Sequence, residues 1–167
     1  MQKNSGVEFV IVERLTKKKL TIAVCESCTG GLISKRITDV PGASTVFGYG
    51  VCTYANEAKI KLLKVKKQTL DNYGAVSEQT AVEMAAGMLE LSGADIAIST
   101  TGIAGPGGGT SKKPVGLVYT AICTKSGYAK CKKLMLGNIE NPTRENIRHA
   151  ASDEAMQLVL DYSENER

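Results

Sequence analysis

The sequence contains no tryptophan and few aromatic residues of any kind, which narrows the nucleic acids that the chain is able to bind. Aromatic residues make up 5% of the 167 residues, whereas proteins that bind single strands stack the bases on aromatic side chains. The formal net charge of +4 is too small to indicate a duplex DNA partner, although it favours a phosphate-bearing substrate. We therefore expect no nucleic-acid partner.

Long apolar runs are also lacking. No run approaches the roughly 18 residues that a membrane-spanning helix needs. The N-terminal sequence MQKNSGVEFVIVERL does not have the layout of a signal peptide. The sequence therefore predicts a cytoplasmic protein without a membrane partner, in which the five cysteines stay reduced.

Histidine is nearly absent, and this weighs against metal and triad chemistry. His149 is the single His of the chain, and only Cys25 and Cys28 form a CxxC pair. A zinc site draws its ligands from several such groups, so we predict no metal site. We interpret His149 as structural, because no Ser-His-Asp triad can be built around it.

The hydrophobic pattern mixes helices with short apolar strands. Turn residues Lys125-Ser126-Gly127 separate the last two strands and predict a hairpin, whereas the earlier strands belong to βα units. The mixture predicts an α/β fold with a mixed central sheet covered by helices on both faces, organised as a single domain over residues 1–167. The predicted helices are 5–18, 32–40, a short one after Asn56, 77–93 and 142–160, and the predicted strands are 20–24, 46–55, 95–101, 116–124 and 128–137.

The first stretch with chemical potential is Cys25-Glu26-Ser27-Cys28-Thr29-Gly30-Gly31, at the junction of a buried strand and a helix. A Ser on such a turn is able to point its hydroxyl outward beside backbone amides that stabilise an oxyanion. On spacing alone, a simpler interpretation is that Ser27 or Thr29 caps the helix. A redox role for Cys25 and Cys28 is weaker, because Cys25 ends the strand and is expected to point into the core.

The second stretch is Tyr54-Ala55-Asn56-Glu57-Ala58-Lys59. If Asn56 caps a helix, Lys59 lies in its first turn, where the helix dipole disfavours a cation and lowers the Lys pKa. Burial and the like charge of Lys61 act in the same direction, whereas Glu57 opposes them. A neutral Lys is able to act as a base. The simpler alternative is a solvated surface Lys beside a carboxylate.

Two further stretches are candidates for binding. The glycine-rich segment Thr101–Thr110 follows a buried strand, and its backbone amides are able to approach an anion or a carbonyl closely. It matches neither a Walker loop nor GxGxxG. Arg144 and Arg148 are four residues apart on the last helix, share a face, and are able to clamp a phosphate, or else are solvated at the surface.

Taken together, these residues resemble the CinA C-terminal domain family, the nicotinamide-nucleotide amidohydrolases. The matching stretches are ESCTGG (26–31), TDVPGAS (38–44), TYANEAK (53–59), GAVSEQT (74–80) and TGIAGPGGGTSKKPVG (101–116). The resemblance implies a three-layer α/β/α sandwich. It also implies hydrolysis of the carboxamide of nicotinamide mononucleotide to nicotinate mononucleotide and ammonia, with no metal or organic cofactor.

The same resemblance implies roles for particular residues. Ser27 is the expected nucleophile, with Lys59 and Tyr54 as its partners. The expected substrate-binding residues are Thr29, Gly30, Gly31, Asn56, Thr101, Gly102, Gly105, Gly107 and Arg144. The expected partner is the pyridine mononucleotide, and self-association into a homo-oligomer stays open. The alternative is a nucleotide-binding or regulatory module, in which ESCTGG holds a phosphate at a helix N-terminus.

Overall fold

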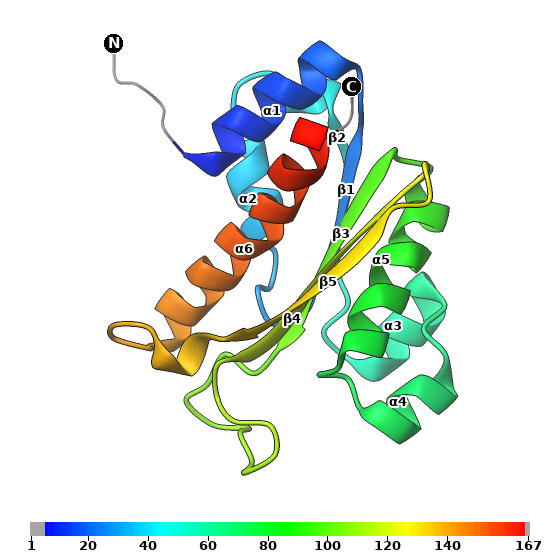
Figure 1. The fold of residues 1–167 in the computed structure, drawn as a ribbon. Helices are drawn as coiled ribbons and strands as arrows, with labels where there is room; N and C mark the ends of the chain where they lie inside the picture. Colours follow the sequence, from blue (N-terminus) through cyan, green and yellow to red (C-terminus); the bar gives the residue numbers. More distant parts are fainter. Residues whose placement is uncertain (1–5, 166–167) are drawn as a thin grey trace.

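The computed structural model describes residues 6–165 and consists of one five-stranded sheet between two layers of helices (Figure 1). The strand order is β2-β1-β3-β4-β5. Strands β1, β2 and β3 run parallel, β4 is antiparallel to β3, and β5 is antiparallel to β4. The strands are β1 Ile22–Glu26, β2 Phe47–Cys52, β3 Ile96–Gly102, β4 Leu117–Thr124 and β5 Ala129–Met135. The predicted mixed sheet is confirmed.

Helices cover both faces of the sheet, which confirms the three-layer α/β/α architecture. Helices α1, α2 and α6 lie on one face, and α3, α4 and α5 lie on the other (Figure 1). Among the described residues, the α-helices are α1 Val7–Lys18, α2 Leu32–Thr38, α3 Asn56–Leu63, α4 Lys67–Tyr73, α5 Glu78–Ser92 and α6 Arg144–Asn165, and the short 3₁₀ turns are η1 Ala43–Thr45 and η2 Leu136–Asn138. None of these helices combines the length and the apolar character that crossing a bilayer requires.

The central strands are buried on both faces, as parallel strands flanked by helices are expected to be. All five residues of β1 are buried. Ile22 and Val24 face the core under α1 and α6, whereas Ala23 and Cys25 face the core under α5. Alternate residues of one strand therefore join two cores, and each large apolar side chain buried there contributes roughly 1.5–3 kcal/mol. The packing of β1 on both sides fixes where its carboxyl end lies.

Several predicted boundaries are shifted. The first strand occupies Ile22–Glu26 instead of 20–24, and the last helix continues to Asn165. Helix α4 was not predicted, because it buries only Thr69 and Leu70 and therefore has a weak apolar pattern. Asn56 is not a helix cap: Ala55 holds the extended N-cap conformation, and Asn56 is the first residue of α3. The predicted cap at Ser77 is confirmed, since its side chain accepts from the Thr80 amide.

Gly87 allows α5 to approach the end of α3. A Cβ atom at this position would lie 1.8 Å from the carbonyl oxygen of Leu63, so no side chain fits without moving backbone. Gly87→Ala normally favours a helix by up to about 1 kcal/mol. Here we expect it to lower the free energy of unfolding by about 2–3 kcal/mol, because α3 must move.

Urea unfolding of the Gly87→Ala variant measures this loss. Gly48→Ala is the matched control, because a Cβ atom there meets nothing within 4 Å, and its effect should stay within about 0.5 kcal/mol. A Gly87→Ala protein as stable as the control would contradict the close approach of the two helices.

Candidate active site

The predicted site residues gather at the carboxyl ends of the three parallel strands. Ser27 directly follows β1, and its amide donates to the Thr100 carbonyl of β3 (3.0 Å). Thr53 directly follows β2, and its amide donates to the Glu26 carbonyl (2.8 Å). The segments after β1 and β2 and the end of β3 are therefore neighbours, at the sheet edge where α/β folds place their sites.

The buried carboxylate of Glu26 organises the turn that carries Ser27. Its Oε2 atom accepts from the amides of Gly31 (3.0 Å) and Ile33 (3.1 Å), and its Oε1 atom accepts from the amide (2.9 Å) and hydroxyl (2.8 Å) of Ser34. Glu26 thus caps the N-terminal end of α2, which has no side-chain cap at its own N-cap residue, Gly31. Such charge-assisted bonds are stronger than neutral ones, so the turn is held at both ends.

The two glycines of this turn adopt a backbone that other residues avoid. Gly30 and Gly31 have φ angles of 59° and 92°, in the left-handed region that favours glycine. This conformation brings the amide of Gly31 to the Glu26 carboxylate. The glycine pair therefore closes the turn back onto the strand from which it came.

Ser27 and Lys59 lie in direct contact. The Nζ atom of Lys59 is 3.2 Å from the Oγ atom of Ser27, and it donates to the carbonyls of Thr53 (2.6 Å) and Tyr54 (3.3 Å). Lys59 is 1% exposed and Ser27 8% exposed. A Lys side chain in a helix leans toward the N-terminal end, which directs the amine of Lys59 back to the residues that precede α3. The simpler alternative of a solvated surface Lys is wrong.

Burial lowers the pKa of the Lys59 ammonium, while the nearby Cys28 and Cys25 act in the opposite direction. The predicted direction is thus confirmed, with burial as its main cause; Lys61 and Glu57 are exposed. The surrounding atoms also suit a neutral amine. Two N–H groups satisfy the carbonyls of Thr53 and Tyr54, which leaves the lone pair of the nitrogen to accept the hydroxyl proton of Ser27.

The three residues expected to bind substrate in this turn, Thr29, Gly30 and Gly31, differ in whether their amides are already bonded. The Gly30 amide donates to the Ser27 carbonyl (3.1 Å) and the Gly31 amide donates to Glu26, so neither is free for a ligand. Within residues 6–165, the amides of Cys28 and Thr29 have no hydrogen-bond acceptor. They directly follow Ser27, the position from which an oxyanion donor comes in a nucleophile elbow.

Gly102 supplies a further amide from β3. Ile103 donates to the Leu117 carbonyl (2.9 Å), and bonded positions alternate along an antiparallel pair. Gly102, opposite Val118 on β4, is therefore at a position whose N–H points away from β4 and toward the end of β1. The hydroxyl of its neighbour Thr101 donates to the Ala75 carbonyl (2.7 Å), which links β3 to the segment before α5.

Arg144 and Arg148 reach the same edge of the sheet from α6. Arg144 donates to the Gly105 carbonyl (2.7 Å) and to the Tyr54 hydroxyl (3.2 Å), while Arg148 donates to the Thr29 carbonyl through Nε (3.2 Å) and Nη2 (2.5 Å). Ser27 and Lys59 contact each other directly, and the Tyr54 hydroxyl accepts from Arg144.

The other predicted site residues lie at the surface or bond within the fold. Asn56 and Gly107 are exposed at the surface, and so is His149 on α6. The Thr29 hydroxyl is buried and forms a 2.7 Å hydrogen bond with the Thr100 hydroxyl. This bond ties the turn after β1 to β3.

The cysteines do not form a reactive thiol pair. Burial raises the pKa of Cys28 to about 12 and the pKa of Cys25 well above its usual range, so both thiols stay protonated at neutral pH. Cys25 donates to the buried carbonyls of Met84 and Ile98. In the described part of the chain, no three His, Cys, Asp or Glu side chains are close enough together to hold a metal ion.

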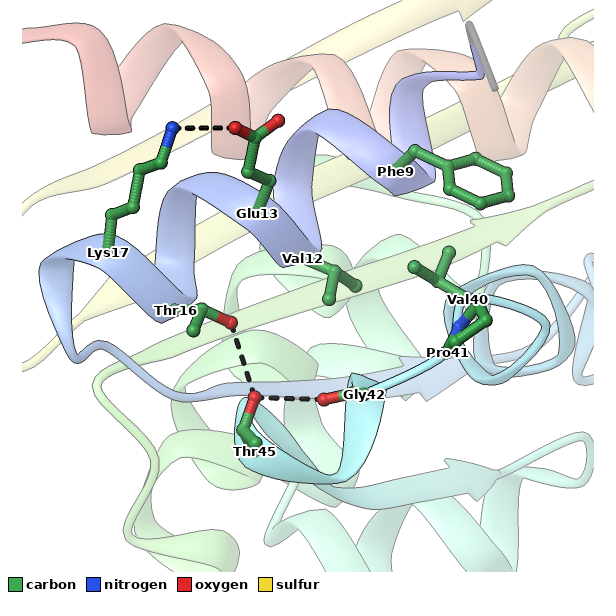
Figure 2. Close-up of a pocket in the computed structure, with 9 residues that line it drawn as sticks. All are labelled: Phe9, Val12, Glu13, Thr16, Lys17, Val40, Pro41, Gly42 and Thr45. Carbon is green, nitrogen blue, oxygen red and sulfur yellow. Dashed lines mark hydrogen bonds and ion pairs between the residues drawn. The ribbon is translucent and has the colours of Figure 1, made fainter. Parts of the chain in front are cut away.

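A surface hollow elsewhere on the molecule lacks comparable groups. It lies between α1 and residues 40–45, and its charged side chains, Glu13 and Lys17, pair with each other at 2.6 Å (Figure 2). Thr16 bonds to Thr45, which donates to the Gly42 carbonyl. The polar groups drawn there with hydrogen bonds thus bond to one another.

Sequence reasoning missed the roles of Glu26 and Thr53, the residues whose contacts define the two turns. The available signal for Glu26 was a charged residue at the end of an apolar run, before a helix that begins with Gly-Gly instead of a Ser, Thr or Asp cap. No sequence signal distinguishes Thr53 from the other threonines.

Comparisons with known proteins agree with this architecture. The family model described as CinA C-terminal domain matches residues 4–163. A protein of Clostridium acetobutylicum named for competence-damage induction is 50% identical over 150 residues, which are 90% of this chain and 36% of that protein. A CinA-like protein of Desulfovibrio desulfuricans is 50% identical over 159 residues, which are 93% of this chain and 36% of that protein. The chain therefore spans just over a third of the length of these curated relatives.

A solved structure gives the same result. The competence/damage inducible protein CihA from Agrobacterium tumefaciens superposes with a TM-score of 0.87 at 39% identity, covering 96% of this chain and 98% of that one.

Replacing the Glu26 carboxylate tests its place in the fold. Glu26→Gln keeps the size of the side chain but turns an amide donor toward backbone N–H groups. We expect the free energy of unfolding to fall by about 2–4 kcal/mol, because buried donors lose a charged acceptor. Urea unfolding measures the loss. The control is Glu13→Gln, an exposed pair with Lys17, where the change should stay below about 1 kcal/mol.

The lowered pKa of Lys59 also predicts how stability changes with pH. Between the folded pKa and the ordinary Lys value of 10.5, the unfolded chain binds more protons, so the free energy of unfolding rises with pH. Below that window, wild type must bury an ammonium. We expect wild type to gain stability relative to Lys59→Met as pH rises toward 10.5, measured by urea unfolding at several pH values. A difference that stays constant over this range would contradict the burial of the charge. Lys61→Met, at an exposed Lys on the same helix, controls for the loss of one positive charge.

Proposed function

The chain belongs to the CinA C-terminal domain family, and from this premise we propose that it is an amidohydrolase of nicotinamide mononucleotide. The reaction hydrolyses the carboxamide to nicotinate mononucleotide and ammonia, with Ser27 as nucleophile and neutral Lys59 as base. The family resemblance supports the choice of substrate, and the geometry of the site supports the choice of nucleophile and base.

One observation carries the proposal: a fully buried Lys amine lies 3.2 Å from the hydroxyl of a Ser at a strand end. A Ser hydroxyl is a weak nucleophile until a neighbouring base takes its proton. Burial lowers the Lys59 pKa, and a Lys amine serves as a base only in its neutral form. The dyad therefore pairs a nucleophile with a base, without needing the single, exposed His149.

The proposed reaction has two halves. In the first, Ser27 Oγ attacks the amide carbon while Lys59 takes its proton, and Lys59 then delivers that proton to the departing nitrogen, which leaves as ammonia. In the second, Lys59 takes a proton from water, the hydroxide attacks the ester, and Ser27 recovers its proton. The amides of Cys28, Thr29 and Gly102 are the proposed oxyanion donors, each worth about 3 kcal/mol of barrier. No metal or organic cofactor takes part.

The two arginines of α6 are the proposed phosphate ligands. Arg148 donates to Thr29 in the turn that carries Ser27, and Arg144 donates to Gly105 and Tyr54, in the segments that follow β3 and β2. Guanidinium groups bind phosphate oxygens with paired hydrogen bonds. A substrate with its amide at Ser27 and its phosphate toward α6 would place Tyr54 and the segment around Gly105 along its length.

The alternative of a regulatory phosphate-binding module receives less support. It requires free amides at the N-terminus of α2, but the amides of Gly31, Ile33 and Ser34 already bind the Glu26 carboxylate. A phosphate there would have to displace a buried negative charge and would be repelled by it. The site therefore favours catalysis over phosphate binding at this helix.

Ammonia release from nicotinamide mononucleotide tests the proposal directly. We expect Ser27→Ala to lose at least about 10³-fold in kcat, the scale of removing a nucleophile. Lys59→Arg should be equally inactive, because Arg keeps its proton. Wild-type activity should rise with pH through an ionisation below the ordinary Lys value of 10.5.

Lys61→Arg is the matched control, since Lys61 is an exposed Lys on the same helix, and it should keep wild-type turnover. Equilibrium binding of the mononucleotide to each variant separates lost chemistry from lost affinity. Substantial turnover by a folded Lys59→Arg protein would remove Lys59 as the base.

A further inference from the structure

Thr53 has a hydroxyl group that the fold buries and leaves without a partner. The residue is 0% exposed, and among the described residues its Oγ1 atom is the one buried side-chain nitrogen or oxygen that makes no hydrogen bond. A buried hydroxyl without a partner costs about 1–3 kcal/mol. The exception therefore needs a reason, and stability does not supply one.

Neighbouring strands show that this fold readily satisfies buried hydroxyls. On β3 the hydroxyl of Ser99 donates to the Ala81 carbonyl at 2.6 Å, and on β4 the hydroxyl of Thr120 donates to the Ser99 carbonyl at 2.9 Å. Buried polar groups are bonded in the great majority of cases. The unpaired group thus belongs to a residue whose carbonyl accepts a hydrogen bond from the Lys59 amine.

The backbone of Thr53 bonds to Lys59 and to the residue that precedes Ser27. Its amide donates to the Glu26 carbonyl, directly before Ser27, and its carbonyl accepts the shortest bond of the Lys59 amine, at 2.6 Å. The unpaired hydroxyl belongs to the same residue as that carbonyl. Rotation about one side-chain bond is the movement that redirects it.

The hydrogen bonds of Lys59 change during the proposed reaction. When Lys59 is neutral in the free enzyme, its two N–H groups donate to the carbonyls of Thr53 and Tyr54. Its lone pair is then left for the Ser27 hydroxyl, whose oxygen lies 3.2 Å away. Once ammonia has left, Ser27 Oγ is bonded to the acyl carbon and has no hydrogen to donate. The buried lone pair of Lys59 then lacks its donor until water arrives.

We propose that the Thr53 hydroxyl replaces Ser27 as the partner of the Lys59 amine while Ser27 carries the acyl group. It donates to the lone pair of the neutral amine, and it accepts an N–H when the amine becomes an ammonium. Thr53 is thus a positioning residue that acts through Lys59, and it serves the hydrolysis of the acyl-enzyme more than its formation. The role in turnover rests on the proposed function.

The kinetic test separates the two halves of the reaction. For nicotinamide mononucleotide, kcat/KM reports acylation, whereas the methyl ester of nicotinate mononucleotide acylates faster and makes its kcat report deacylation. We expect Thr53→Val to lower the kcat for the ester about tenfold, as for one lost hydrogen bond, and to leave kcat/KM for the amide unchanged. Thr53→Ser restores the hydroxyl and should restore the rate. Equal losses in both constants, no loss in the ester kcat, or failure of Thr53→Ser to recover would overturn the proposal.

A second measurement needs no turnover and therefore distinguishes failure of this inference from failure of the proposed function. Ser27→Ala removes the Ser27 hydroxyl. It therefore mimics the acyl-enzyme, in which Ser27 has no hydrogen to donate to Lys59. NMR titration of ¹³Cε-labelled Lys gives the Lys59 pKa in that background. Adding Thr53→Val should lower this pKa by about one unit, because a charge-assisted bond to the ammonium is lost. The neighbouring thiols of Cys25 and Cys28 are the same in both proteins. An unchanged pKa overturns the proposal even if wild type has no amidohydrolase activity.

Stability provides the control for a purely structural role. Thr53→Val removes an unpaired hydroxyl, so its Tm should equal or exceed that of wild type. Thr120→Val removes a bonded one and should lower Tm. A Thr53→Val protein that loses as much Tm as Thr120→Val would show that the hydroxyl supports the fold and would refute its assignment to Lys59.

Discussion

The candidate active site depends on the buried carboxylate of Glu26, which accepts hydrogen bonds from Gly31, Ile33 and Ser34. Glu26 is the last residue of β1, so the same residue ends the strand and caps the next helix. Its carbonyl meanwhile accepts the Thr53 amide. One residue therefore fixes both the turn of Ser27 and the segment whose carbonyls bind Lys59. This arrangement buries the charge of the Glu26 carboxylate, and both of its oxygens accept hydrogen bonds.

Lys59 makes one contact with a residue distant in sequence, Ser27, and two with residues close to it in sequence. Ser27 and Lys59 meet because β1 and β2 are parallel neighbours, with Glu26 opposite Cys52. Lys59 is also held by the carbonyls of Thr53 and Tyr54, only a few residues before it. The local bonds orient the amine, and the sheet brings the nucleophile to it. Burial of both groups then sets the charge state on which the chemistry depends.

Much of the fold followed from the sequence, because buried strands, the hairpin and the Ser77 cap have strong local patterns. Ser27 and Lys59 were predicted from motifs, and the structure brings them together. The prediction failed where two arrangements share one local pattern. Asn56 is a good cap by type, yet Ala55 occupies that position. The amides of Gly30 and Gly31 bind the Ser27 carbonyl and the Glu26 carboxylate instead of a ligand. Whether the Thr53 hydroxyl finds a partner depends on the positions of all the residues packed around it. Only the three-dimensional structure therefore reveals that it is unpaired.

The parallel pairing of β1 with β2 has a consequence for folding. Strands that run parallel cannot be joined by a tight turn, and here α2 and η1 form the crossover between them. Closing such a non-local pairing is slow compared with forming a helix or a hairpin. Helix α3 and the carbonyls that seat Lys59 are able to form early, but the Ser27 contact exists only after the crossover has closed. The Ser27–Lys59 contact is therefore a marker for assembly of the parallel half of the sheet. During refolding it should appear later than the helical structure does.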